Sequence, residues 1–137
     1  MMPLVERSSA TIGFYGDDLN PSEITERLGR APTFEARKGD ERASRSGRFA
    51  QTGVWLLEAE GREPADLNGQ INDLLDSLTG DLSIWRSLSG RFRGRVYCGL
   101  FLGSTNEEVD IGRDTLARMV DRELYLGLDL YGPRSSD

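Results

Sequence analysis

The segment from Glu123 to Tyr131 alternates between leucine and other residue types. Successive side chains of a β-strand point to opposite faces, so this pattern predicts a strand with one apolar face and one polar or aromatic face. A central strand of a doubly wound parallel sheet is apolar on both faces, so we expect a sheet with helices on one side only. The residues expected to face those helices are Leu124, Leu126, Leu128 and Leu130.

The rest of the chain alternates between strand and helix patterns. Strands are predicted at 10–16, 53–60 and 92–103, and helices at 20–28, 67–78 and 112–122, with a further helical turn at 82–88. The helix at 67–78 has the clearest apolar stripe, and Leu116, Met119 and Val120 are expected to point inward from the helix at 112–122. This order favours an α+β fold with a mainly antiparallel sheet, as a ferredoxin-like split βαβ arrangement with an inserted helix. A doubly wound α/β sheet is the alternative.

Composition limits the classes of protein. The 137 residues suit one domain, 1–137, in which 30–52 reads as a long polar loop. Histidine is absent, which excludes Ser-His-Asp and Cys-His nucleophile systems, and we expect no metal and no cofactor. The net charge of −6 argues against nucleic acid as a partner. The absence of a long apolar run argues against a membrane, and the single cysteine, Cys98, fits the cytoplasm.

A stretch near the N-terminus carries a family resemblance. The letters LNPSEITERLG combine a helix N-cap, Asn20, with a stop at Gly29, and APT and RKGD follow. With the strand containing Trp55, the leucine-rich helix from Leu67, and the strand ends GLFLG and LDLY, this pattern resembles a bacterial family known as domain of unknown function 4279. The resemblance implies an α+β fold over nearly the whole chain and supplies no catalytic residues.

The second face of the predicted sheet is the main candidate surface. It would present aromatic and arginine side chains, with one acid, away from the helices. Trp55 is included, although the apolar face of its strand is ambiguous because the adjacent residues Leu56 and Leu57 point to opposite faces. The candidates are Tyr15, Trp55, Arg93, Arg95, Tyr97, Phe101, Tyr125, Asp129 and Tyr131. Aromatic residues and arginine are enriched at the buried centres of interfaces, so such a face predicts a partner.

Three hypotheses for this face remain open. It would form a homodimer, sheet against sheet; it would line a cleft for a ligand or peptide beneath the 30–52 loop; or that loop or the segment around Trp85 would cover it as a second core. We therefore expect a small cytoplasmic binding domain, with a homodimer favoured and a protein or small-molecule partner as the other option. An enzyme that uses carboxylates and arginines, or an inhibitor or immunity-type protein, is the alternative function.

Two smaller features complete the candidates. Arg37, Lys38 and Asp40 form a polar loop site that includes the only lysine of the chain, although RKGD lacks the glycine spacing of a phosphate-binding loop. Cys98 shares the apolar side of its strand with Val96 and Leu100, which predicts a buried and unreactive thiol. No catalytic residue is assigned.

Overall fold

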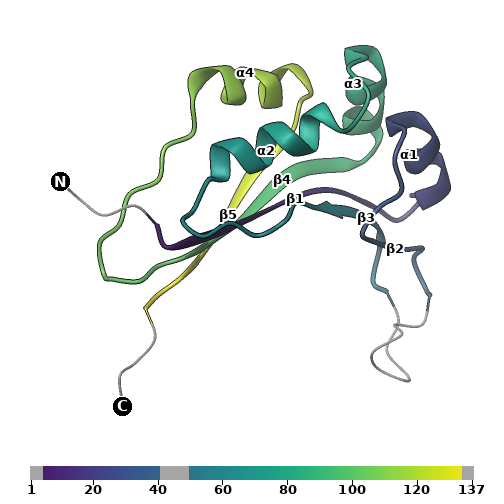
Figure 1. Ribbon diagram of the computed structural model, residues 1–137. Helices are drawn as coiled ribbons and strands as arrows, with labels where there is room; N and C mark the ends of the chain where they lie inside the picture. Colours follow the sequence, from purple (N-terminus) through teal and green to yellow (C-terminus); the bar gives the residue numbers. More distant parts are fainter. Residues whose placement is uncertain (1–4, 41–49, 134–137) are drawn as a thin grey trace.

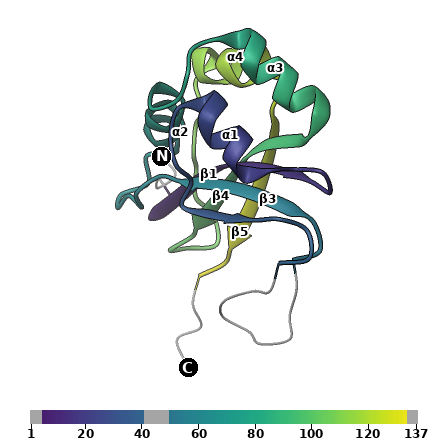
Figure 2. The same cartoon turned by 90° about the vertical axis from the view of Figure 1, so that its right-hand side faces the viewer.

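The computed structural model describes residues 5–40 and 50–133. Within these ranges the chain forms five strands and four helices. Their bounds are β1 Arg7–Gly16, α1 Pro21–Leu28, β2 Phe34–Ala36, β3 Gly53–Glu58, α2 Leu67–Asp76, α3 Leu82–Arg91, β4 Arg93–Phe101, α4 Arg113–Asp121 and β5 Tyr125–Tyr131. All four helices lie on the same side of the sheet (Figures 1 and 2). The fold is therefore α+β, as the sequence predicts.

The sheet is mixed, with the strand order β2-β3-β1-β4-β5. β3 and β4 flank β1 and both run antiparallel to it, whereas β5 runs parallel to β4. The prediction of a mainly antiparallel sheet therefore needs a correction at its β5 edge. The physical reason is the connection through α4, because two neighbouring parallel strands require a crossover of this kind.

A single apolar core lies between the sheet and the helices. Ile12 and Phe14 of β1 and Val96 of β4 are fully buried beneath the helix layer. Phe14 also packs against both tryptophans, with ring-centroid distances of 6.4 Å to Trp55 and 6.1 Å to Trp85. Burial of these large side chains is the main favourable contribution to folding, and it fixes which sheet face is turned inward.

Two expectations about packing and loops are corrected. Leu116 and Val120, predicted to point inward, are 41% and 72% exposed, and the residues that α4 buries are Thr115 and Met119. The expected 30–52 loop contains the short strand β2, because this segment pairs antiparallel with residues 54–56 of β3. Residues 41–49 of that loop lie outside the described residues. No described helix has the length and apolar character needed to cross a membrane.

Candidate functional site

The sheet side without helices, here called the open face, gathers most of the predicted site residues. All four tyrosines of the chain point to it, whereas both tryptophans are in the core. Strand register sets Tyr15 beside Arg93, Arg95 beside Tyr125, and Phe101 beside Tyr131. The predicted site residues on the open face are Tyr15, Arg93, Arg95, Tyr97, Phe101, Tyr125, Asp129 and Tyr131, and the structure adds Arg7.

Two arginines of β4 lie over tyrosine rings. The Arg95 guanidinium carbon is 5.0 Å from the ring centroid of Tyr15 and 4.6 Å from that of Tyr97. Arg93 lies 5.2 Å from the ring centroid of Tyr125 on the neighbouring strand. Such cation–π contacts hold each guanidinium in place by attraction to the ring and leave its N–H donors at the edge.

Asp129 joins two tyrosines at the centre of the β4–β5 pair. The hydroxyls of Tyr97 and Tyr131 both donate to Asp129 Oδ2, at 2.6 Å and 2.7 Å. These hydrogen bonds lower the pKa of Asp129 from its usual value. The same bonds to the carboxylate raise the pKa of Tyr97 and of Tyr131, since losing the hydroxyl proton would remove them. Asp129 therefore stays ionised and fixes both rings.

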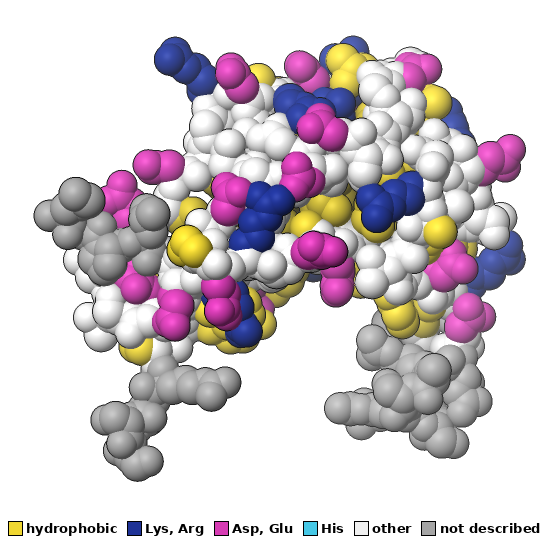
Figure 3. Space-filling view, in the orientation of Figure 1, with side chains coloured by type: hydrophobic (Ala, Val, Ile, Leu, Met, Phe, Trp, Pro, Cys, Tyr) yellow, Lys and Arg dark blue, Asp and Glu magenta, His cyan; other side chains and the backbone are white. Residues whose placement is uncertain are grey.

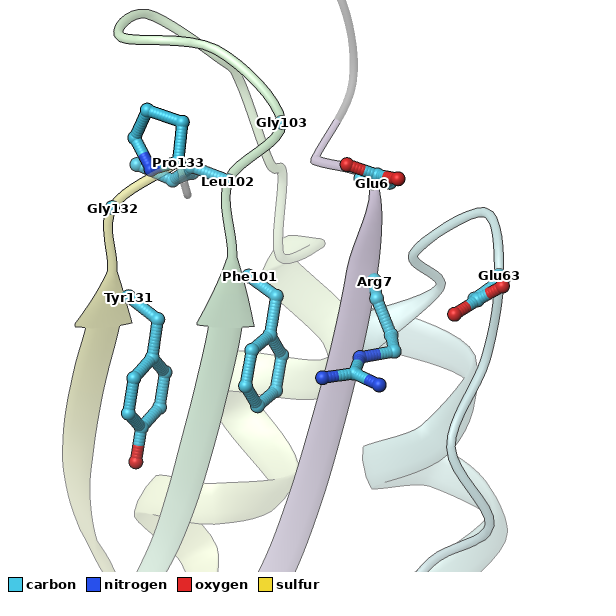
Figure 4. Close-up of a pocket in the computed structure, with 9 residues that line it drawn as sticks. All are labelled: Glu6, Arg7, Glu63, Phe101, Leu102, Gly103, Tyr131, Gly132 and Pro133. Atoms are coloured by element: carbon cyan, nitrogen blue, oxygen red, sulfur yellow. The ribbon is translucent and has the colours of Figure 1, made fainter. Parts of the chain in front are cut away.

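A shallow pocket of about 670 Å³ extends the open face at the end where β4 and β5 stop and β1 begins. Figure 4 shows Arg7, Phe101 and Tyr131 side by side on its floor, one from each of these strands. The rings of Phe101 and Tyr131 are stacked at 4.6 Å with an interplanar angle of 4°, and Arg7 lies 4.0 Å above the Phe101 ring. Glu6 and Glu63 also line this pocket, on the Arg7 side of it (Figure 4).

Glycines beneath the rings allow this arrangement. A Cβ at Gly127 would lie 3.2 Å from Cδ2 of the Tyr97 ring, and one at Gly99 would lie 3.4 Å from Cε2 of Phe101. The Tyr97 ring therefore packs on Gly127 of the neighbouring strand, and the Phe101 ring packs on Gly99 of its own strand. Such packing also compensates for the poor strand propensity of glycine. The glycines were not identified as site residues from the sequence, although their alternation with aromatic residues is the signal that could have found them.

The arginines of the open face make no ion pair within the described structure, in contrast to Arg62, Arg91 and Arg118. Among residues 5–40 and 50–133, neither Arg7, Arg93 nor Arg95 has a carboxylate within 4.0 Å, and Nε of Arg95 is buried without a hydrogen-bond partner. Arg91 instead makes a bidentate pair with Glu23, at 2.7 Å and 2.9 Å. Figure 3 likewise shows basic and acidic side chains next to one another over the helix layer. Arg95 donates to the Tyr15 hydroxyl at 3.4 Å, and the remaining guanidinium donors of the three open-face arginines have no hydrogen-bond partner among the described residues.

Trp55 is not part of this surface. Its side chain is fully buried on the helix side of β3, and its indole N–H donates to Thr25 Oγ1 of α1 at 3.0 Å. The ambiguity of the strand is resolved by register, because Val54 and Leu56 are the β3 residues that share the open face with Tyr15 and Gly13. The hypothesis that the Trp85 segment covers the open face is also wrong, since Trp85 lies in the same helix-side core.

The loop candidates Arg37, Lys38 and Asp40 form a turn directly after β2, which is outside the strands β1, β4 and β5 that carry the open-face candidates. The backbone N–H of Arg37 donates to Asp40 Oδ2 at 2.8 Å, and Gly39 adopts a positive φ of 91°. Lys38 pairs with Asp17 at 3.1 Å, and this contact lowers the pKa of Asp17. Both side chains of the pair are largely exposed, so the contact contributes little to stability.

Neither Cys98 nor the acidic side chains of the described residues form a reactive site. Cys98 is fully buried, and desolvation raises the pKa of its thiol to about 12. Within the described ranges, no group of three or more Cys, Asp or Glu side chains is arranged to hold a metal ion. The open face is therefore suited to binding a ligand through its flat aromatic rings, its guanidinium groups and the hydrogen-bonded carboxylate of Asp129.

Comparison with known proteins gives one match. The family model described as Domain of unknown function (DUF4279) matches residues 6–133, nearly the whole chain. No curated protein and no solved structure matches. The match extends from the first residues of β1 to the end of β5, so it includes every strand that builds the open face.

Proposed function

The chain belongs to the family Domain of unknown function (DUF4279), and we propose that it is a binding domain whose open face captures an acidic peptide segment of another protein. The ligand class is an extended segment that carries carboxylates next to apolar side chains. Its carboxylates would accept from the guanidinium groups, and its apolar side chains would lie on the aromatic rings.

The observation that carries the proposal is that three arginines without carboxylate partners among the described residues lie over aromatic rings on one sheet face. In a chain with a net charge of −6, acids are abundant, yet Arg7, Arg93 and Arg95 are held over aromatic rings instead. Arginine is the residue best suited to bidentate recognition of a carboxylate. The fixed positions of these side chains reduce the entropy lost when a ligand binds.

Charge also favours a different chain over a second copy on this face. The strand residues of the open face carry three arginines against two acids, Asp129 and Glu58, with Glu6 and Glu63 only at the pocket end, whereas the whole chain is acidic. Two copies placed sheet against sheet would bring arginines toward arginines, which opposes association. We therefore favour the peptide hypothesis over the face-to-face homodimer. The acidic remainder of the chain disfavours long polyanions such as nucleic acid.

We also propose the finer features of the fold and location. The unit β3–α2–α3–β4, with β1 between its two strands, supports a split βαβ arrangement of the ferredoxin-like kind. One domain over 1–137 and a cytoplasmic location are part of the same proposal. The single, buried cysteine is compatible with a reducing compartment.

We expect Arg95→Gln to weaken binding of a fluorescein-labelled peptide that alternates glutamate with leucine. Loss of one charged hydrogen-bonding group typically costs about 1.5–3 kcal/mol, so the dissociation constant should rise by about tenfold or more. Fluorescence anisotropy titration measures this constant directly. For the unmodified protein, raising the salt concentration should also increase the dissociation constant, because salt screens the exposed charges.

The matched control for this titration is Arg91→Gln. Arg91 also lies over an aromatic ring, 4.7 Å from the centroid of Phe92, but Glu23 already occupies its guanidinium. This variant should bind the peptide as tightly as the unmodified protein. An equal loss of peptide affinity in Arg91→Gln and Arg95→Gln, or no loss of affinity in either variant, would contradict the proposal.

A further inference from the structure

The exposed apolar side chains of the described chain are concentrated at one edge of the sheet. Of eight large apolar side chains that are exposed, seven lie on α4 or β5, and the eighth is Phe34 of β2 at the opposite edge. The seven are Leu116, Val120, Tyr125, Leu126, Leu128, Leu130 and Tyr131. Tyr125 and Tyr131 belong to the open face, but the other five residues are separate from its arginines, since the three β5 leucines point to the helix side of the sheet.

The leucines are exposed because α4 leans on α2 instead of covering β5. Arg118 of α4 donates to Asn72 Oδ1 and to Asp76 Oδ1 of α2, at 2.7 Å and 2.8 Å. Successive helix residues are rotated by about 100°, so residues two positions from Arg118 lie on nearly the opposite flank. Those residues are Leu116 and Val120, which therefore face away from α2 and are exposed.

The backbone of β5 is also unpaired on that edge. β5 is the last strand of the sheet and pairs only with β4 among the described residues. The N–H of Leu102 donates to the carbonyl of Tyr131, so the odd-numbered residues of β5 direct their backbone groups toward β4. Backbone direction alternates along a strand, which leaves the N–H and C=O groups of Leu126, Leu128 and Leu130 pointing to the free edge.

The usual protections of an edge strand are missing here. β5 is seven residues long, its pairing with β4 runs without a bulge, and it contains neither lysine nor proline. Its one charged residue, Asp129, is held by the hydroxyls of Tyr97 and Tyr131. An edge that is long, regular and apolar pairs readily with another strand.

We propose that β5 pairs with β5 of a second copy of this chain, antiparallel about a twofold axis at Leu128, to form a continuous ten-stranded sheet. The occupant is a second copy because the strand is complementary to itself in this register. Leu128 pairs with its own equivalent, Leu126 with Leu130, Tyr125 with Tyr131, and Gly127 with Asp129. Registers centred elsewhere on the strand leave more of its seven residues unpaired.

Charge and hydrogen bonding select the same register. Asp129 falls opposite the small Gly127 of the second copy, so the two carboxylates do not face each other. The outward backbone groups of all three leucines meet their counterparts as hydrogen-bonded pairs. Pairing of two strands alone buries less than the roughly 800 Å² per partner of a stable interface, so the dimer needs further apolar contact, for which the exposed side chains Leu116 and Val120 of α4 are the candidates.

The first test measures molecular mass by light scattering at increasing concentration. The unmodified chain should approach twice its 15.2 kDa, and Leu128→Lys should weaken self-association by about a hundredfold, because two cations then lie on the axis in place of two leucines. Leu128 is 52% exposed, so the variant keeps its fold, which circular dichroism checks. Phe34→Lys, at the other edge, is the matched control and should remain dimeric.

The second test measures the register by disulfide formation. Equivalent Cα atoms at Leu128 would lie about 5.5 Å apart, within the range that a disulfide spans, so Leu128→Cys should crosslink. Leu126→Cys and Leu130→Cys should each fail alone, because their own equivalents are about 13 Å apart, but should crosslink when mixed. Cys98 is buried and does not compete.

A monomer at high micromolar concentration, a dimer that Leu128→Lys does not weaken, or equal crosslinking by all three cysteine variants would each overturn the proposal. Peptide binding by Arg95 is measured separately. Leu128→Lys should still bind the acidic peptide, and Arg95→Gln should still dimerise. If the dimer dissociates in Arg95→Gln and persists in Leu128→Lys, self-association uses the open face and the proposal is wrong.

Discussion

Replacing Trp55 by alanine is expected to lower the free energy of unfolding by about 3–5 kcal/mol, because a fully buried large aromatic side chain is removed. Trp55 packs edge-on against Phe14 and donates to Thr25, so it ties β3 to β1 and to α1. The loss is a large fraction of the 5–15 kcal/mol that a domain of this kind typically has. Urea unfolding followed by circular dichroism gives the value.

Tyr125→Ala is the control on the other side of the sheet. Tyr125 is 63% exposed and lies on the open face, so its removal should cost less than about 1 kcal/mol. Trp55→Phe, which keeps a ring but loses the indole N–H, should fall between the two variants and stays measurable if Trp55→Ala does not fold. A larger cost at Tyr125 than at Trp55 would reverse our assignment of the two faces.

Gln70→Ala is expected to cost about 3 kcal/mol, because it leaves several buried polar groups without partners and also creates a cavity. The Gln70 side chain is fully buried on α2. It accepts from Ser8 Oγ at 2.5 Å and donates to the carbonyls of Ser8 and Glu60, at 3.0 Å and 2.6 Å. It thus fastens the start of β1 to α2, and thermal unfolding measures the loss.

The chain offers a matched control for this substitution. Gln51, the other glutamine, is exposed, and Gln51→Ala should change stability by less than about 0.5 kcal/mol. Gln70→Leu, which fills the volume but makes no hydrogen bonds, separates the two contributions. If Gln70→Leu is as stable as the unmodified chain, the hydrogen bonds do not contribute as we infer.

Strand alternation predicted the two faces correctly wherever one face was clearly polar or aromatic. In β4 the alternation of Arg95 and Tyr97 with Val96 and Cys98 placed all four residues correctly. In β3 it failed, because apolar side chains occupy both faces and no period distinguishes them. Only the pairing with β1, a contact between distant parts of the sequence, places Trp55 in the core.

Periodicity identified the side of the sheet but not whether a second layer covers it. Leu126 and Leu128 point to the helix side, as predicted, yet remain exposed because α4 is held toward α2 by Arg118. The inward orientation predicted for Leu116 and Val120 failed for the same reason. Helix placement depends on side-chain contacts between elements, which a local pattern does not contain.

The chemistry of the open face required three-dimensional pairing. The sequence identified Arg95, Tyr97 and Asp129 as candidates, but not that Asp129 accepts from two tyrosines. Nor did it indicate that Arg95 lacks a carboxylate partner among the described residues. Gln70 was missed because a polar residue beside an apolar stripe normally lies on the surface.

The claim that the open face recognises carboxylates through Arg95 is tested most directly by the arginine side-chain Nε–H resonances in a nitrogen-15-labelled sample. On addition of the glutamate–leucine peptide, the resonance of Arg95 should shift and saturate, while that of Arg91, already paired with Glu23, should stay in place. An unchanged Arg95 resonance at saturating peptide, or a shift confined to Arg91, would contradict the account.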